Sequence, residues 1–341
     1  MISRPRRLFL LLWIIIGASL IILVWAAFPG DENGVGEQAP PAASTTPASS
    51  PTTAPTPTNA PTTSIPSSTT APPVTTLPPD QQSVPTDATS LAAELTEAER
   101  MIRSVVDPNE VAPWGRRQQH LYRTLSANPG WSADVLAATP SDVVQAVENN
   151  WLARQNLSAL VNSVALSTTL PAWRISDPLP AAELVSYYKE AEGLTGIPWE
   201  YLAAINLVET RMGRIEGLST AGAVGPMQFL PSTWDECCKG DPADDRDAIM
   251  GAAVYLDLTG GPEDMARAVK AYNRSDRYVN AVEAYVRVLS DDETAYSGYH
   301  SWQVYFLSSA GLILMPTGYE ETQPVDVVTW LESNPTALVS S

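Results

Sequence analysis

The sequence contains very little cysteine and histidine. Among its 341 residues there are two Cys, adjacent at Cys237 and Cys238, and two His, His120 and His300. Zinc-type sites need three or four protein ligands, most of them Cys or His. We therefore expect no metal site, no cofactor and no catalysis that depends on histidine. The composition leaves carboxylate chemistry as the main option.

Positive charge is also scarce. The chain has 20 Lys and Arg against 38 Asp and Glu, which gives a formal net charge of -18. Proteins that bind nucleic acids neutralise phosphates with a basic surface. A nucleic-acid partner is therefore not expected.

The two cysteines are direct neighbours in the chain. Cα atoms joined by a trans peptide lie about 3.8 Å apart, which is below the usual minimum of about 4.4 Å for the Cα atoms of a disulfide. An oxidising compartment would permit a bond between Cys237 and Cys238. We nevertheless expect free or strained thiols without a function.

Residues 8–28 form a long apolar run near the N-terminus. At about 1.5 Å per residue, a helix of this length crosses a bilayer core of roughly 30 Å. Three Arg precede the run, so the positive-inside rule predicts that residues 1–7 are a cytoplasmic tail. The rest of the chain is then on the extracytoplasmic side of the plasma membrane. The alternative is a cleaved signal peptide, whose apolar region is usually about 7–15 residues long; both interpretations export the body.

The segment 29–90 consists mainly of Ala, Pro, Ser and Thr. Such a composition cannot bury enough apolar surface to offset the entropy of ordering, so we expect a disordered linker. Three further parts follow: a helical region over 91–180, a second helical part over 181–292, and a C-terminal segment over 293–341 that we expect to pack on the second part.

Helical periodicity dominates after residue 90. Leu91, Leu95, Ala98 and Ile102, for example, recur at steps of three and four, which is typical of an amphipathic helix. The sequence predicts further helices over 141–161, 181–192, 198–212, 244–256, from 262 onward, and over 278–289. A strand pattern appears only at 302–307. The fold class is therefore mostly α.

Glu209 occupies an unusual position in the helix expected over 198–212. It lies on the same face as Leu202 and Ile205, and we expect Gly213 to end the helix. Burial disfavours the ionised carboxylate and raises its pKa, which would supply the protonated acid that glycoside cleavage needs. The structural alternative is a Glu paired with Arg211 or Arg214.

A loop rich in small residues follows, over 218–231. Two glycines let the backbone approach a ligand closely. Ser219 and Gln228 offer donors and acceptors of the kind that bind sugar hydroxyl and acetamido groups. A tight packing loop is the alternative interpretation.

Three motifs occur in order: NLVETRMG, STAGAVGPMQFLPSTW and AYNRSDRYVNAV. Together they resemble the lytic transglycosylases of the goose-lysozyme-like superfamily, and most closely the membrane-bound B-type enzymes with their E-T-x-x-G motif. The preceding GRRQQHLYRTL is similar to actinobacterial members. The resemblance covers about 198–289. It implies that 181–292 is a lysozyme-like, SLT-type catalytic domain with an N-terminal helical extension.

The resemblance also implies the site residues. Glu209 matches the catalytic Glu. The substrate-binding residues that it implies are Ser219, Met227, Gln228, Tyr272, Asn273 and Tyr278. The sequence departs from the family at Arg274-Ser275, where many relatives have Ala-Gly, and Cys237-Cys238 has no counterpart.

The implied substrate is the glycan strand of peptidoglycan. Glu209 would protonate the oxygen of the MurNAc-β-1,4-GlcNAc bond and then deprotonate the C6 hydroxyl, which gives a 1,6-anhydroMurNAc end. Two alternatives stay open. A lysozyme-like hydrolase would need a second carboxylate, for which Glu216, Asp235 and Glu236 are the nearest in sequence. A non-catalytic peptidoglycan-binding scaffold would need neither.

Overall fold

The computed structural model describes residues 77–161 and 165–339, and those from 78 onward belong to one compact unit. The expected cytoplasmic tail, membrane helix and most of the expected linker lie outside these residues. Within the described part, no helix is long and apolar enough to cross a membrane.

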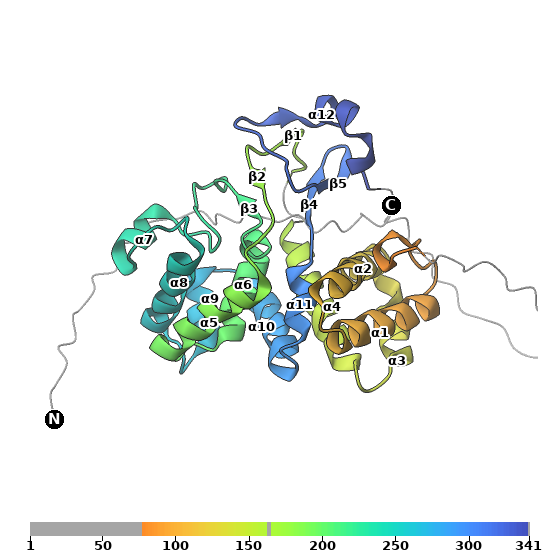
Figure 1. Ribbon diagram of the computed structural model, residues 1–341, viewed down its shortest axis with the longest axis horizontal. Helices are drawn as coiled ribbons and strands as arrows, with labels where there is room; N and C mark the ends of the chain where they lie inside the picture. Colours follow the sequence, from red (N-terminus) through yellow and green to blue (C-terminus); the bar gives the residue numbers. More distant parts are fainter. Residues whose placement is uncertain (1–76, 162–164, 340–341) are drawn as a thin grey trace, which may run out of the picture. The chain divides into compact units, whose positions relative to one another are not determined.

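The described chain is mostly helical, which confirms the predicted fold class at that level (Figure 1). The α-helices are α1 Ala88–Ser104, α2 Pro108–Ala127, α3 Ser132–Ala138, α4 Val144–Val161, α5 Ala181–Thr195, α6 Trp199–Thr210, α7 Pro231–Cys237, α8 Asp245–Thr259, α9 Met265–Tyr272, α10 Asp276–Asp291, α11 Ala295–His300 and α12 Val327–Ser333. Short 3-10 turns lie at Pro79–Gln81, Pro129–Trp131 and Pro335–Ala337.

The end of the expected linker makes defined contacts. Asp87 caps α1 by accepting a hydrogen bond from the backbone N–H of Ser90 at 2.8 Å. Asp80 pairs with Arg116 on α2 at 2.6 Å. The buried Arg117 donates to the carbonyl oxygens of Gln82 and Ser83 at 2.9 and 2.7 Å. Residues 80–87 are thus fastened to α1 and α2.

Helix α6 lies inside the largest core. Every residue from Leu202 to Thr210 is buried, so the helix is enclosed on all sides and does not have the single apolar face that its sequence suggested. It ends at Thr210, and Arg211 follows in the left-handed conformation with φ 58°. The expectation that Gly213 ends the helix is therefore wrong, because Arg211 and Met212 already bond back to Leu207 and Asn206 as a helix C-cap does.

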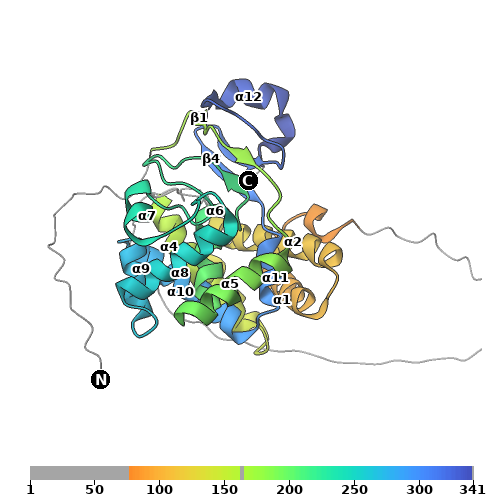
Figure 2. The ribbon, with the colours of Figure 1, turned by 60° about the vertical axis from the view of Figure 1, so that its left-hand side comes forward.

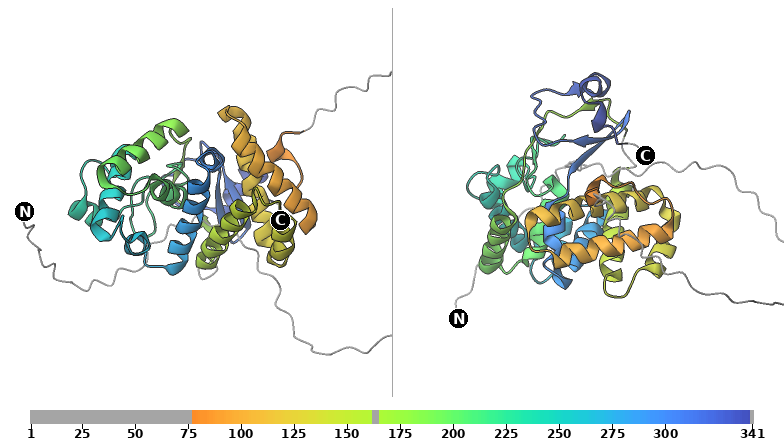
Figure 3. Two further views of the ribbon diagram at one scale, coloured as in Figure 1. Left: turned by 90° about the horizontal axis from the view of Figure 1, so that it is seen from below. Right: turned by 45° about the vertical axis from the view of Figure 1, so that its right-hand side comes forward.

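Helices α4 and α10 pack against each other along their lengths (Figure 3). Ala146, Ala153 and Leu157 of α4 belong to the same hydrophobic core as α6, α8 and α10. The region before residue 180 and the region after it therefore share one core. A separate, smaller core lies among α1, α2, α3 and α4.

Within the described residues, the named β-strands form three antiparallel pairs, and isolated β-bridges lie outside them. β1 Thr169–Leu170 pairs with β6 Val325–Asp326, β2 Arg174–Ile175 with β3 Ile215–Glu216, and β4 Val304–Ser308 with β5 Gly311–Met315. Strand β4 overlaps the predicted strand. The β1, β4 and β5 strands and α12 gather on one side of the helices (Figures 1 and 2).

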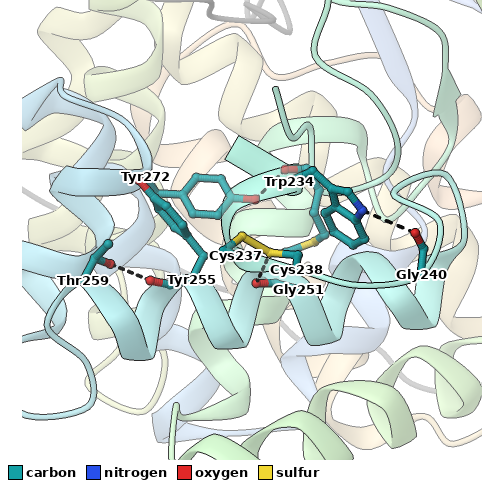
Figure 4. The surroundings of a disulfide bond; sticks show 9 residues. Trp234, Cys237, Cys238, Gly240, Gly251, Tyr255, Thr259 and Tyr272 are labelled. Carbon is teal, nitrogen blue, oxygen red and sulfur yellow. Dashed lines mark hydrogen bonds between the residues drawn. A yellow bond between two sulfur atoms is a disulfide. The ribbon is translucent and has the colours of Figure 1, made fainter. Parts of the chain in front are cut away.

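Cys237 and Cys238 form a disulfide, with an S–S distance of 1.97 Å (Figure 4). The expectation of free thiols is therefore wrong. It rested on the Cα separation, 3.7 Å here, whereas the bond requires only that the two sulfur atoms meet. Cys237 ends α7 and Cys238 is extended, so the side chains are not held about 100° apart as in a continuing helix.

Candidate active site

The Glu209 carboxyl is buried next to Tyr278. Glu209 lies in the last turn of α6 and is 8% exposed. Tyr278 lies in the first turn of α10 and donates its phenol O–H to Oε1 of Glu209 at 2.6 Å. The contact therefore joins two helices that are far apart in sequence, and it occupies one of the two carboxyl oxygens.

Burial raises the pKa of Glu209 to about 7, and the hydrogen bond from Tyr278 partly opposes that rise. A group with this pKa is present in both protonation states near neutral pH, as a proton shuttle must be. The two Arg considered as alternative partners of Glu209 contact other groups here. Arg214 lies 3.2 Å from Asp177, and Arg211 donates to the carbonyl of Leu207.

The loop after α6 is bonded to the end of that helix. The Thr210 hydroxyl and the Asn206 amide donate to the carbonyl oxygen of Pro226 at 2.6 and 2.9 Å. Tyr188 on α5 donates to Oδ1 of Asn206 at 2.6 Å. All three side chains are buried. The backbone that precedes Met227 and Gln228 is thus fixed from the helix that carries Glu209.

A second anchor reaches the loop from α9. The Tyr272 hydroxyl donates to the carbonyl oxygen of Met227, and its ring meets that of Phe229 edge-on, with centroids 5.6 Å apart. The side chain of Met227 is fully buried. It therefore contributes to the core, whereas the resemblance implied that it lines a substrate subsite.

Ser219 and Gln228 differ in how their polar atoms are used. The Ser219 hydroxyl oxygen accepts from the N–H groups of Ala221 and Ala223 at 3.2 and 2.8 Å, so it holds the loop. Gln228 has a left-handed φ of 53° and donates to the Gly225 carbonyl at 2.8 Å. Its Oε1 is buried and has no partner in the described part of the chain. That atom is an unused hydrogen-bond acceptor.

Asn273 ends α9, and its Oδ1 accepts from the N–H of Ser275 at 3.1 Å. This contact shapes the turn into α10 and thereby sets the position of Tyr278. Of the seven residues implied by sequence, Glu209 and Tyr278 share one hydrogen bond. Met227 and Tyr272 form a second contact, and Ser219, Gln228 and Asn273 act within their own loops.

Sequence reasoning missed Asn206, Thr210 and Tyr188. The first two lie within the quoted NLVETRMG motif, and polar residues in a buried helix are the signal that could have identified them. Across residues 77–161 and 165–339, no group of three or more His, Cys, Asp or Glu is placed to hold a metal ion.

Comparison with known proteins gives a partial match. No family model matches the chain, and no solved structure matches it. The chain is similar to the membrane-bound lytic murein transglycosylase F of Thiobacillus denitrificans (strain ATCC 25259 / T1), with 25% identity over 150 residues. The match covers 42% of this chain and 32% of that relative, so the chain spans about a third of the relative's length.

Proposed function

We propose that this protein is a peptidoglycan lytic transglycosylase with a lysozyme-like catalytic domain. The observation that carries the proposal is the buried Glu209 carboxyl, with a pKa near 7 and one oxygen held by Tyr278. The similarity to a lytic murein transglycosylase supports it. The proposed residue roles are those of the resemblance, refined by the contacts described above.

In the first step, protonated Glu209 donates its proton to the glycosidic oxygen between MurNAc and GlcNAc. Because Tyr278 occupies Oε1, we assign the reactive proton to Oε2. The C1–O bond breaks and its electron pair stays on the departing oxygen. Positive charge at C1 is stabilised by the acetamido group of the muramoyl sugar itself, as in other substrate-assisted glycosidases.

In the second step, ionised Glu209 removes the proton from the C6 hydroxyl of the same sugar, and O6 bonds to C1. The carboxyl returns to its protonated form. The Tyr278 hydrogen bond favours the ionised form and so limits the rise in the pKa of Glu209. The carboxyl can therefore donate the proton in the first step and accept one in the second.

Hydrolysis would require a second carboxylate to activate water. Of the three candidates nearest in sequence, Glu216 is held by Arg174 at 2.8 Å and by Ser176 at 2.6 Å. Asp235 and Glu236 are exposed on α7. These placements favour the intramolecular reaction, in which no second acid takes part.

The test is digestion of purified peptidoglycan by the full chain, followed by mass spectrometry. The proposal predicts fragments with 1,6-anhydro ends, which are one water lighter than fragments with reducing ends. The Glu209→Gln variant should release no glycan fragments. Reducing ends would establish a hydrolase instead. Binding without any fragments would establish a scaffold.

The proposed location is the outer face of the plasma membrane, with residues 8–28 as the anchor and 29–76 as a tether to the glycan. Fractionation of cells that express the full chain should place it in the membrane pellet. A variant lacking 8–28 should leave that pellet if the anchor is correctly assigned.

A further inference from the structure

A cavity of about 400 Å³ lies beside the loop that follows Glu209. Its walls come from four segments, around residues 176–179, 212–218, 224–226 and 243–245. Met212 and Pro226 belong to the lining, whereas Glu209 does not. The cavity is therefore a hollow distinct from the Glu209–Tyr278 contact, although both border the same loop.

Two of the three carboxylates in the lining are already engaged. Asp177 lies 3.2 Å from Arg214. Glu216 accepts from Arg174 and Ser176.

Asp245 is different. Its Oδ1 lies beside Gly213. A Cβ atom added to that glycine would be 2.9 Å from this oxygen. Within the described residues its carboxylate has no hydrogen-bond or ion-pair partner. Burial, together with the nearby charges of Asp244, Glu216 and Glu183, raises the pKa of Asp245 to about 6. The lining therefore carries negative charge and, within the described residues, includes no Lys or Arg.

The rest of the cavity is largely apolar. The apolar lining residues are Pro178, Leu179, Met212, Ile215, Leu218, Val224 and Pro226. Such walls suit an aliphatic chain, with the charged group at its end. A divalent cation fits poorly, because Ca²⁺ takes six to eight oxygen ligands and a single unengaged carboxylate is present.

We propose that this cavity binds a primary ammonium group carried on an aliphatic chain, with Asp245 as its counter-charge. In the substrate, that group belongs to the diamino acid of the peptide stem on the muramoyl sugar. The assignment to the stem rests on the proposed function. Recognition of the stem amine would then distinguish free stems from those whose amine is already cross-linked.

The spacing agrees with this assignment. Met212 is three residues after Glu209, so their Cα atoms lie at most about 11 Å apart. The third residue of an extended peptide stem reaches roughly 10 Å from its point of attachment. A muramoyl sugar at Glu209 could therefore place its diamino acid at the cavity.

The test uses the full chain in detergent micelles and isothermal titration calorimetry. The ligand is a tripeptide of alanine, glutamate and lysine linked as in the stem, compared with the same peptide acetylated on the lysine amine. We expect the free amine to bind at least about tenfold more tightly, as a charge-assisted hydrogen bond supplies. Asp245→Asn should abolish that difference.

Asp235→Asn is the matched control, because it removes the same charge from the exposed face of α7 and should retain the difference. Equal affinity for the two peptides, no binding of either, or a difference that persists in Asp245→Asn would overturn the proposal. The tripeptide has no glycosidic bond, so the result is independent of cleavage. Amine-dependent binding by a chain that cleaves no glycan would refute the enzymatic function and leave this site intact.

Discussion

Thr210, the residue directly after Glu209, donates its hydroxyl to the carbonyl of Pro226 at 2.6 Å. This bond fixes the position of the loop before Met227 and Gln228 relative to the last turn of α6. Asn206, one turn earlier, bonds the same carbonyl. Any movement of this loop against the proposed acid would break two buried hydrogen bonds.

Replacing Thr210 with Val should weaken the connection between α6 and this loop. The variant keeps the side-chain volume and loses the donor to Pro226 and the acceptor of the Gly213 N–H. We expect a loss of about 1–2 kcal/mol in the free energy of unfolding and a lower kcat/KM on peptidoglycan. Urea denaturation and initial rates measure the two effects. Thr210→Ser retains the hydroxyl and should restore most of both; if Ser and Val behave alike, the hydrogen bond does not matter.

Tyr278→Phe should shift the pH profile. The Tyr278 hydrogen bond lowers the pKa of Glu209, so its loss should move the alkaline limb of the rate profile to higher pH, because the acid stays protonated longer. We also expect about a tenfold fall in rate from lost positioning. Tyr285→Phe is the control: its hydroxyl, on the same helix, is buried and has no partner within the described residues. An unchanged limb in Tyr278→Phe would contradict the assignment.

Glu209→Gln should abolish cleavage and change how stability depends on pH. The folded-state pKa, about 7, lies above the ordinary value of 4.5, so the folded state binds the proton more tightly than the unfolded chain. The wild-type protein therefore loses stability as pH rises from about 4.5 to 7, by about 3 kcal/mol. The Gln variant does not titrate. Its advantage in urea unfolding should be near zero at pH 4 and largest at pH 8; equal curves at both pH values would show that the carboxyl is not desolvated.

Truncation tests where the folded body begins. A chain that starts at residue 77 should keep its activity and thermal stability. A chain that starts at residue 91 loses the Asp87 cap of α1, worth about 1 kcal/mol, and both carbonyl acceptors of the buried Arg117. We expect its melting temperature to fall markedly in differential scanning calorimetry. Identical melting temperatures would show that residues 77–90 contribute nothing.

The helices could be predicted because their apolar periodicity is strong, and α8, α9 and α10 begin close to the expected positions. The sequence predicted that Glu209 is buried, but it did not predict how completely its helix is enclosed. The periodicity placed it on one apolar face, whereas the structure buries every residue of α6 from Leu202 to Thr210. That burial results from long-range packing, which no local pattern contains.

The details of the site were less predictable. Tyr278 was included by resemblance to an aromatic position, but its bond to Glu209 depends on how α10 crosses α6. The hydroxyl of Ser219 and the side chain of Met227 are used for folding the loop and the core, which their residue types did not reveal. The disulfide escaped prediction because a distance rule for separated cysteines was applied to neighbours.

The packing of α4 on α10 limits how this protein can be divided. Because Ala146, Ala153 and Leu157 complete the core around the proposed catalytic helix, residues 181–292 alone would expose that apolar surface to water. The helical extension is thus part of the smallest unit that buries this core and is not an appended accessory. Recombination between related chains at residue 180 should leave this apolar surface mismatched, whereas exchange ahead of residue 77 would leave the unit whole and change only what precedes it.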